Sequence, residues 1–416
     1  MTAPKGPLEG AAVTAARIRE LFDTIGAIGR TSDGGCHRPA FSAAERSARM
    51  ALVDAGRGLG LAAARDRMGS VFLVRPGRES TLPAVFTGSH LDTVPRGGCF
   101  DGAAGVLCGL AAVELLDRVG IETRRPVVVV SWANEEGARF SPATMGSGVF
   151  TGALAYERAV EATDAEGVRL EQELLRETLP ETPCEELPEP GVYLELHPEQ
   201  GRVLENAGAS IGVVAGVQGQ VSGDWVIQGR ADHAGTTPMY DRADALVAAS
   251  NLIAEIPRLA AAESPGVATV GEVRVEPGAR NVVPGRVHGT LDIRHPEDDA
   301  VERLLGAVLS GGARIAEGAG CTFTWEEAWR SPSVRFDEGV LAAVADCAAH
   351  RHVPSVRLTS GAGHDAVHMS SRCPSGMIFV PSRDGISHSP SEYTSYADLA
   401  AGATVLAEAL ITLASQ

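Results

Sequence analysis

Short apolar runs alternate with longer amphipathic stretches along the first 135 residues. Helices are predicted over 11–30, 44–66 and 104–117, and buried strands over 71–74, 83–90 and 126–133. Buried strands that alternate with helices indicate an α/β fold with a mainly parallel sheet flanked by helices. Ligands bind such sheets beyond the carboxyl ends of the strands, so polar residues that follow the apolar runs are candidate site residues.

The pattern changes after residue 211. Three segments alternate apolar and polar residues, as antiparallel strands with one exposed face do: V-S-G-D-W-V-I-Q-G (221–229), V-A-T-V-G-E-V-R-V (267–275) and V-H-G-T-L-D-I-R (287–294). Helical stretches lie near 242–262 and 298–317. This order predicts a smaller α+β, ferredoxin-like domain at 213–330. It is inserted into a discontinuous larger domain formed by 1–212 and 331–416.

Composition and charge narrow the class of protein. The 416 residues include 36 Lys and Arg against 53 Asp and Glu, and the resulting net charge of −17 disfavours nucleic-acid binding. No run approaches the ~18 apolar residues needed to span a bilayer, and no signal-peptide pattern begins the chain. The seven cysteines are scattered without a C-x-x-C pair, which favours a reducing, cytoplasmic location. The acidic segment 161–190 is interpreted as a solvated helix and turn.

Acidic and imidazole side chains follow two of the predicted strands. His90 ends the run 83–90, with Asp92 two residues later, and this pair is either a metal-site pair or a surface pair at a strand end. Asp101 precedes the helix at 104 and is either a ligand or the helix N-cap. Glu135 and Glu136 follow the run 126–133, where two adjacent carboxylates are costly to bury without a function.

Two more histidines complete a candidate metal set. His197 ends an apolar alternation, and His388 follows the run M-I-F-V-P. The set of candidate ligands is therefore His90, Asp101, Glu136, His197 and His388. Imidazole and carboxylate without thiolate suit zinc, manganese or cobalt. Five ligands are too many for one catalytic zinc with an open position, but they suit two ions that share one carboxylate.

Taken together, these segments resemble the M20 superfamily of metal-dependent amidases. The similarity is to the branch of N-carbamoyl-L-amino-acid hydrolases and allantoate amidohydrolases (hydantoinase/carbamoylase family). The matching segments are GSHLDTVPRGGCFDG, ANEEGARF, HPEQG, HAGTTPM, NVVPG and ISHSP. The resemblance runs from about residue 12 to 412. It implies a di-metal catalytic domain and an inserted lid or dimerisation domain.

The resemblance also assigns roles around the two ions. Asp101 would bridge them, with His90 and His197 completing one site and Glu136 and His388 the other. Glu135 would be the general base, and Asp92 would orient His90. The reaction implied is hydrolysis of the carbamoyl C–N bond of an N-carbamoyl-L-amino acid, 3-ureidopropionate (the β-ureidopropionase reaction) or allantoate.

Further residues would bind the substrate. By the resemblance, His233 polarises the scissile carbonyl from the partner subunit of a homodimer, while Asn281 and Arg294 hold the substrate carboxylate. Gln200 would add a polar contact, and His364 in G-A-G-H-D-A is either a site residue or a structural one. The residues alone favour simpler roles, with Arg294 in an ion pair and Asn281 in a turn.

Two alternative functions stay open. A dipeptidase or N-acyl-amino-acid deacylase of the same superfamily would use the same metal set, although His197 and Arg294 argue against it. A catalytically silent homologue that acts as a binding protein would be expected to have lost ligands, whereas all five and Glu135 are present.

Overall fold

The computed structural model describes all residues except 1–7, 9, 184–185 and 416. The described chain divides into two compact units. Unit 1 comprises residues 1–215 and 336–416, and unit 2 comprises 216–335. These bounds lie within a few residues of the predicted 213–330, and the role of that insertion as a lid or dimerisation domain stays a prediction. Cys184 lies outside the described residues.

A sheet of nine strands among the described residues organises unit 1, although its edge strand β14 and the last two residues of β6 fall within the bounds of unit 2. Its order is β1-β2-β4-β3-β5-β16-β6-β14, and β15 also pairs with β6. The strands are β1 (Ala62–Arg65), β2 (Val71–Arg75), β3 (Ala84–His90), β4 (Val127–Trp132), β5 (Pro190–Pro198), β6 (Ile211–Val217), β14 (Val334–Arg335), β15 (Ser355–Ser360) and β16 (Ser375–Val380). The four central strands β4, β3, β5 and β16 are parallel, whereas β1, β2, β6 and β14 pair antiparallel. The predicted parallel sheet therefore forms the centre of a mixed sheet.

The centre of this sheet is buried because helices pack against it. Every residue of β3 and β4 is buried, which is why both read as continuous apolar runs. The helices of unit 1 are α1 (Ala15–Leu21), α2 (Ala43–Gly58), α3 (Ala103–Arg118), α4 (Met145–Thr151), α5 (Tyr156–Ala159), α6 (Leu170–Leu174), α7 (Val203–Ala207), α10 (Glu338–His350), α11 (Asp365–Met369) and α12 (Tyr396–Ser415). Helices α3 and α12 pack against each other and against the central strands. The α/β fold class is confirmed.

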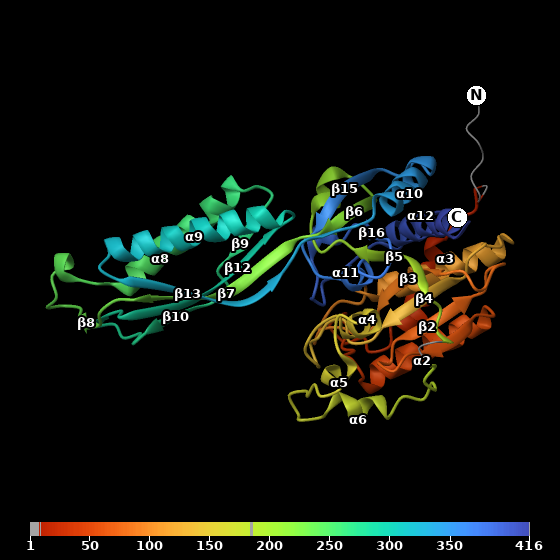
Figure 1. Ribbon diagram of the computed structural model, residues 1–416, viewed down its shortest axis with the longest axis horizontal. Coiled ribbons are helices and arrows are strands. Elements are labelled where there is room, and N and C mark those ends of the chain that lie inside the picture. Colours follow the sequence, from red (N-terminus) through yellow and green to blue (C-terminus); the bar gives the residue numbers. More distant parts are fainter. Residues whose placement is uncertain (1–7, 9, 184–185, 416) are drawn as a thin grey trace. The chain divides into compact units, whose positions relative to one another are not determined.

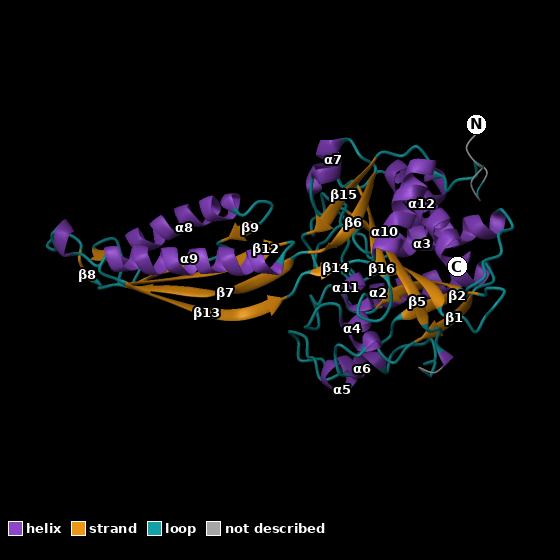
Figure 2. Cartoon of the chain, turned by 45° about the horizontal axis from the view of Figure 1, so that its top comes forward, coloured by secondary structure: helices purple, strands orange, loops and turns teal. Residues whose placement is uncertain are grey.

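Unit 2 is an antiparallel sheet with two helices on one face (Figures 1 and 2). The sheet order is β10-β12-β7-β13, with β9 also on β12, and this is the order of a ferredoxin-like fold. Its elements are β7 (Gly219–Gln228), β8 (Asp232–His233), α8 (Ala245–Ala262), β9 (Val267–Thr269), β10 (Val273–Glu276), β11 (Val282–Val283), β12 (Arg286–His295), α9 (Asp298–Gly318) and β13 (Thr322–Ser331). Buried and half-buried residues alternate along β7 and β12, and the buried set, which includes Trp225, packs with α8 and α9.

Two helices, α8 and α12, are long and apolar enough to cross a membrane by length and composition. Neither helix is a continuous apolar run in the sequence, because each contains charged residues. Most of α12 is buried inside unit 1, and one face of α8 is buried in the core of unit 2. Helix α12 therefore has the burial of a core helix, whereas α8 has that of an amphipathic helix that buries one face.

Two sequence expectations outside the site need correction. The helix predicted over 44–66 ends at Gly58, and Ala62–Arg65 form strand β1 instead. The acidic segment 161–190 is not simply solvated, because Glu173 is buried against Arg46 and Arg139. Arg139 also pairs with the buried Asp164. Since Arg139 follows Glu135 and Glu136 by a few residues, these ion pairs attach the acidic segment to the loop that carries the candidate base.

Candidate metal centre

The carboxyl ends of the four parallel strands meet at one edge of the sheet, and the candidate ligands lie there. His90 is the last residue of β3, and His197 is the next-to-last residue of β5. Glu135 and Glu136 follow β4, and His388 follows β16 after a short turn. The parallel register of these strands brings together residues that are up to 298 positions apart in the sequence.

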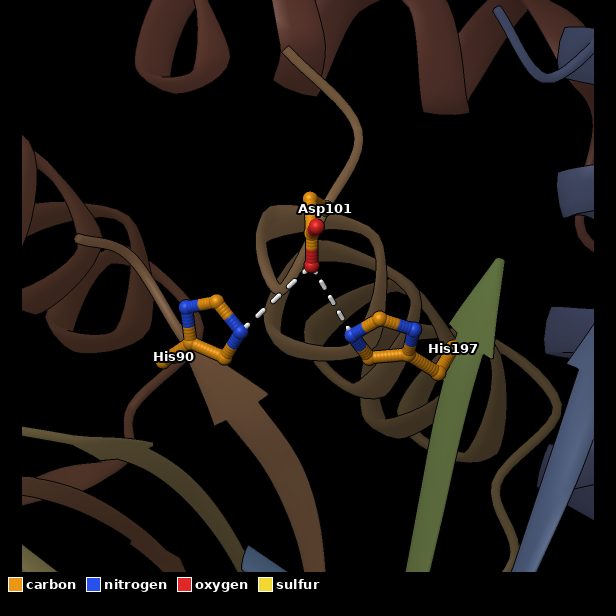
Figure 3. Close-up of side chains that lie close together, drawn as sticks. All are labelled: His90, Asp101 and His197. Carbon is orange, nitrogen blue, oxygen red and sulfur yellow. Dashed lines mark ion pairs between the residues drawn. The ribbon is translucent and has the colours of Figure 1, made fainter. Parts of the chain in front are cut away.

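Asp101 stands at the centre of this group (Figure 3). Its Oδ1 lies 3.1 Å from His197 Nε2 and 3.6 Å from His90 Nε2. Its Oδ2 lies 3.3 Å from His388 Nε2, which in turn lies 3.6 Å from Glu136 Oε2. Each oxygen of one carboxylate therefore faces a separate pair of candidate ligands. Gly102 occupies the N-cap position of α3 without a side-chain cap, so the N-cap role considered for Asp101 is not seen.

The donor set of the two groups fits divalent cations. Ligand atoms of His90, Asp101 and His197 lie within 4.8 Å of one another, and so do those of Asp101, Glu136 and His388. Within the described chain these groups contain only imidazole nitrogens and carboxylate oxygens, the ligands that zinc, manganese and cobalt accept. Cys99 is not among them, and its Sγ lies 3.5 Å from the carbonyl oxygen of Gly34.

The electrostatics of the site reflect an excess of buried carboxylates. Burial raises the pKa of Glu135 well above its ordinary value, and nearby acidic groups add to the effect. Burial and the neighbouring Asp101 raise the pKa of Glu136 to about 7. Burial alone would raise the pKa of Asp101 too, but contacts with His197, His388 and His90 lower it well below the ordinary range. Buried carboxylates of this density require positive charge, which bound cations would supply.

Glu135 lies beside the first group of ligands. Its Oε2 is 3.4 Å from His90 Nε2, and the residue is buried. Asn134, which precedes it, has a φ of 53°, in the left-handed region that asparagine tolerates better than most residues. At this turn the adjacent Glu135 and Glu136 side chains face different partners, His90 and His388.

Asp92 contacts both His90 and the loop that carries Glu135 and Glu136. His90 Nδ1 lies 2.9 Å from the main-chain oxygen of Asp92, closer than the 3.7 Å to its carboxylate. The Asp92 carboxylate instead accepts the main-chain N–H groups of Glu135 at 3.1 Å and Glu136 at 3.2 Å. The side chain of Asp92 thus positions the loop that carries Glu135 and Glu136, while the main-chain carbonyl of Asp92 orients His90.

Gln200 and His364, the two candidate substrate-binding residues of unit 1, contact other side chains of the protein. Gln200 Nε2 donates to Asp101 Oδ2 at 3.0 Å and to Ser387 Oγ at 3.1 Å. His364 is buried, with its Nε2 3.0 Å from Ser360 Oγ and its ring centre 4.6 Å from that of His197. Their contacts are those of residues that support the ligands.

Sequence reasoning missed two buried glutamates at the site. Glu195 accepts hydrogen bonds from Ser89 Oγ at 2.6 Å and from the main-chain N–H of Ala366 at 3.1 Å. Strand alternation places Glu195 on the same face as His197, so a signal for it existed. Glu392 accepts the main-chain N–H of Asp101 at 2.9 Å, and nothing in its local sequence indicates this contact.

The remaining candidate residues belong to unit 2. His233 Nδ1 accepts the main-chain N–H groups of Gly235 at 3.0 Å and Thr236 at 3.2 Å. A neutral ring that accepts at Nδ1 carries its proton on Nε2, so an exposed N–H donor remains. Asn281 lies beside it, because its carbonyl accepts the N–H of Ala234 at 2.9 Å.

Arg294 lies far from His233 within unit 2. It pairs with Asp292 at 2.8 Å, and its strand position is opposite Gln220, at the end of the sheet where the chain enters the unit. Arg286, at the other end of β12, is opposite Gln228, shortly before His233. Eight residues of extended strand span roughly 27 Å. One unit 2 therefore holds Arg294 and His233 at opposite ends of its sheet.

Comparison with known proteins establishes the family. A sequence model described as "Peptidase family M20/M25/M40" matches residues 86–412. The chain belongs to this family. An N-carbamoyl-L-amino acid amidohydrolase of Geobacillus stearothermophilus is 38% identical over 394 residues, covering 94% of this chain and 96% of the relative. An allantoate amidohydrolase of Bacillus subtilis (strain 168) is 34% identical over 404 residues, covering 95% and 97%.

Solved structures agree with this assignment. An amidase of the hydantoinase/carbamoylase family from Burkholderia multivorans has a TM-score of 0.94 at 39% identity, covering 97% of this chain and 99% of that chain. A dinuclear metal-binding peptidase from the M20 family, of Bacillus subtilis, shares the fold, with a TM-score of 0.62 at 15% identity over 96% of this chain and 99% of that one. The M20 resemblance and its hydantoinase/carbamoylase branch, inferred from the motifs, are confirmed.

Proposed function

We propose that this M20 family member is a metal-dependent amidohydrolase that cleaves the carbamoyl C–N bond of an N-carbamoyl amino acid or a related ureido acid. The observation that carries the proposal is Asp101, whose two carboxylate oxygens face separate ligand groups. His90 and His197 would hold one divalent ion, and Glu136 and His388 the other. The relatives named above as N-carbamoyl-L-amino acid and allantoate amidohydrolases support the substrate class.

Zinc, manganese or cobalt would supply Lewis acidity and would lower the pKa of a bound water to near neutrality. Glu135 accepts the proton of the attacking water and returns it to the leaving nitrogen. The raised pKa of Glu135, caused first by its burial, suits a group that must both accept and return a proton. The products are an amino acid and carbamate, which decomposes to ammonia and carbon dioxide.

A homodimer would complete the site. His233 presents an Nε2–H donor that suits a developing oxyanion, and Arg294 presents a guanidinium that suits a carboxylate. A small ureido acid cannot reach both groups within one unit 2, because they lie toward opposite ends of a sheet whose strand between Arg286 and Arg294 spans roughly 27 Å. We therefore assign Arg294 to one subunit's substrate and His233, with the adjacent Asn281, to the partner's.

Ammonia release tests the reaction. Metal-free protein is reloaded with zinc, manganese or cobalt and given N-carbamoyl amino acids, 3-ureidopropionate and allantoate, with N-acetyl amino acids and dipeptides as controls. Metal-dependent ammonia release from a ureido substrate is expected. Hydrolysis of only the acetyl or peptide controls would instead indicate a deacylase or dipeptidase.

Two variants test the proposed roles. Glu135→Gln is expected to lower kcat by about 10²–10⁴-fold while metal binding persists, and full turnover would refute the role of the base. Mixing Glu135→Gln with His233→Ala should restore part of the activity, because one of the mixed sites is intact. Failure of this rescue, with subunit exchange followed by fluorescent labels, would refute the shared site. We also propose a cytoplasmic location, which the free thiols of the six described cysteines support.

A further inference from the structure

The loop that carries His388 also carries Glu392. His388 faces the carboxylates of the candidate metal centre, whereas Glu392 bonds to the main chain beside it. Glu392 is only 6% exposed. Its Oε1 accepts the main-chain N–H groups of Phe100 at 2.8 Å and Asp101 at 2.9 Å. These two consecutive N–H groups converge on one oxygen, immediately next to the carboxylate proposed to bridge the ions.

The other oxygen of Glu392 takes part in the same arrangement. Its Oε2 lies 3.4 Å from Ser387 Oγ, and that hydroxyl lies 3.0 Å from Asp101 Oδ2. The neighbouring Tyr393 ring packs edge-on against Phe100, with ring centres 5.7 Å apart. The 386–393 loop therefore contacts the Asp101 loop at its main chain, its carboxylate and its preceding side chain.

Position 98 needs a glycine because the Glu392 carboxylate lies directly against it. A Cβ atom at position 98 would overlap the Glu392 carboxyl group. Glycine is needed here for space rather than for its backbone angles. A buried carboxylate is stable only when hydrogen bonds replace its water, and the two N–H groups fulfil this requirement.

We propose that Glu392 is a positioning residue that fixes Asp101 so that each of its two oxygens faces its own group of candidate ligands, which would hold the metal ions. The inference rests on the proposed function, because it assumes the two-metal site. Glu392 contacts no proposed substrate group, and it acts through the main chain of Asp101. Residues that orient metal ligands typically change metal affinity by 10–100-fold when they are removed.

Cobalt(II) binding to the metal-free full-length protein tests this role, measured by competition with a chelator and by visible absorption. Glu392→Ala should bind cobalt 10–100-fold more weakly and with an altered absorption spectrum. Glu392→Gln should stay within a few-fold of wild type, because the amide oxygen still accepts both N–H groups. Asp66→Ala is the matched control, since Asp66 is another buried carboxylate that accepts two main-chain N–H groups, from Met68 and Ser70.

A second variant guards against misfolding of Glu392→Ala. Gly98→Ala should displace the Glu392 carboxylate and weaken cobalt binding in the same way, whereas Gly98→Ala combined with Glu392→Ala should be no weaker than Glu392→Ala alone. Wild-type affinity in both Glu392→Ala and Gly98→Ala would overturn the inference. An equal loss in Asp66→Ala would also overturn it. If wild-type protein binds no cobalt, the proposed metal centre itself fails, and this inference with it.

Discussion

Replacing Asp92 with alanine should release the main chain at Glu135 and Glu136 without removing any proposed metal ligand. The Asp92 carboxylate accepts both N–H groups, at 3.1 and 3.2 Å, and it is buried. A hydrogen bond to a charged group contributes about 1.5–3 kcal/mol, so the two together hold the loop with about 3–6 kcal/mol. Asp92→Asn keeps one acceptor oxygen and should lose about half of this.

Hydrogen exchange of metal-free protein, read by mass spectrometry over residues 133–137, measures the effect directly. Each lost bond should accelerate exchange at its amide by about 10–100-fold, since about 1.4 kcal/mol corresponds to a factor of ten. Asp337→Ala is the control, because Asp337 accepts N–H groups from Gly339 and Val340 at the start of α10 and should leave this peptide unchanged.

The same variant separates two roles of Asp92. The main-chain carbonyl that contacts His90 Nδ1 is present in any residue at position 92, so the orientation of His90 should persist in Asp92→Ala. Unchanged exchange at Glu135 and Glu136, combined with weakened metal binding, would refute this reasoning and restore the side chain as the group that orients His90.

Three further predictions concern stability and metal uptake. Burial raises the pKa of Glu45 to about 7 from 4.5, so the folded state holds a proton that the unfolded chain has lost between these pH values. The free energy of unfolding should therefore fall by up to about 1.4 kcal/mol per pH unit across this window, and urea unfolding of Glu45→Gln should lack that slope. Gly102→Ala should abolish metal uptake, measured by elemental analysis, because a Cβ at its φ of 62° would overlap the His90 ring, whereas Gly120→Ala, with open space around it, should retain the metals. Trp225→Ala should destabilise unit 2 by about 3–5 kcal/mol, and hydrogen exchange accelerated equally in both units would contradict its assignment to the core of unit 2.

The sequence was sufficient to select candidate ligands that the fold brings together, because of a property of parallel strands. Four of the five candidates follow apolar runs, and the carboxyl ends of parallel strands share one edge of a sheet. His90 and His197 therefore meet although 106 residues separate them. Apolar alternation likewise located α8 and α9, because each helix buries one face against a sheet whose own residues alternate.

The residues that hold the ligands were harder to predict, for a physical reason. Glu392 and Asp92 act by accepting main-chain N–H groups, and any residue except proline supplies such a group. No side-chain pattern in the donor segment therefore indicates the contact. Gln200 shows a related difficulty: its amide donates to Asp101 and Ser387, contacts that the sequence did not indicate, and its predicted substrate contact stays a prediction. Which partner a buried polar group finds depends on loop conformations that local sequence does not determine.

The buried acids of the centre divide into two kinds with different requirements. Asp92 and Glu392 each accept two main-chain N–H groups, which offset part of the burial that raises the pKa of both carboxyl groups. Glu136 and Asp101 instead face imidazoles at 3.1–3.6 Å, a spacing that leaves each group of ligands open to a cation. The loops are thus held by carboxylates that bond to main-chain N–H groups, whereas the candidate ligands on these loops face imidazoles and would take the positive charge of bound ions. It follows that removing the ions should leave the loop positions intact, so metals would bind a site that the protein has already formed.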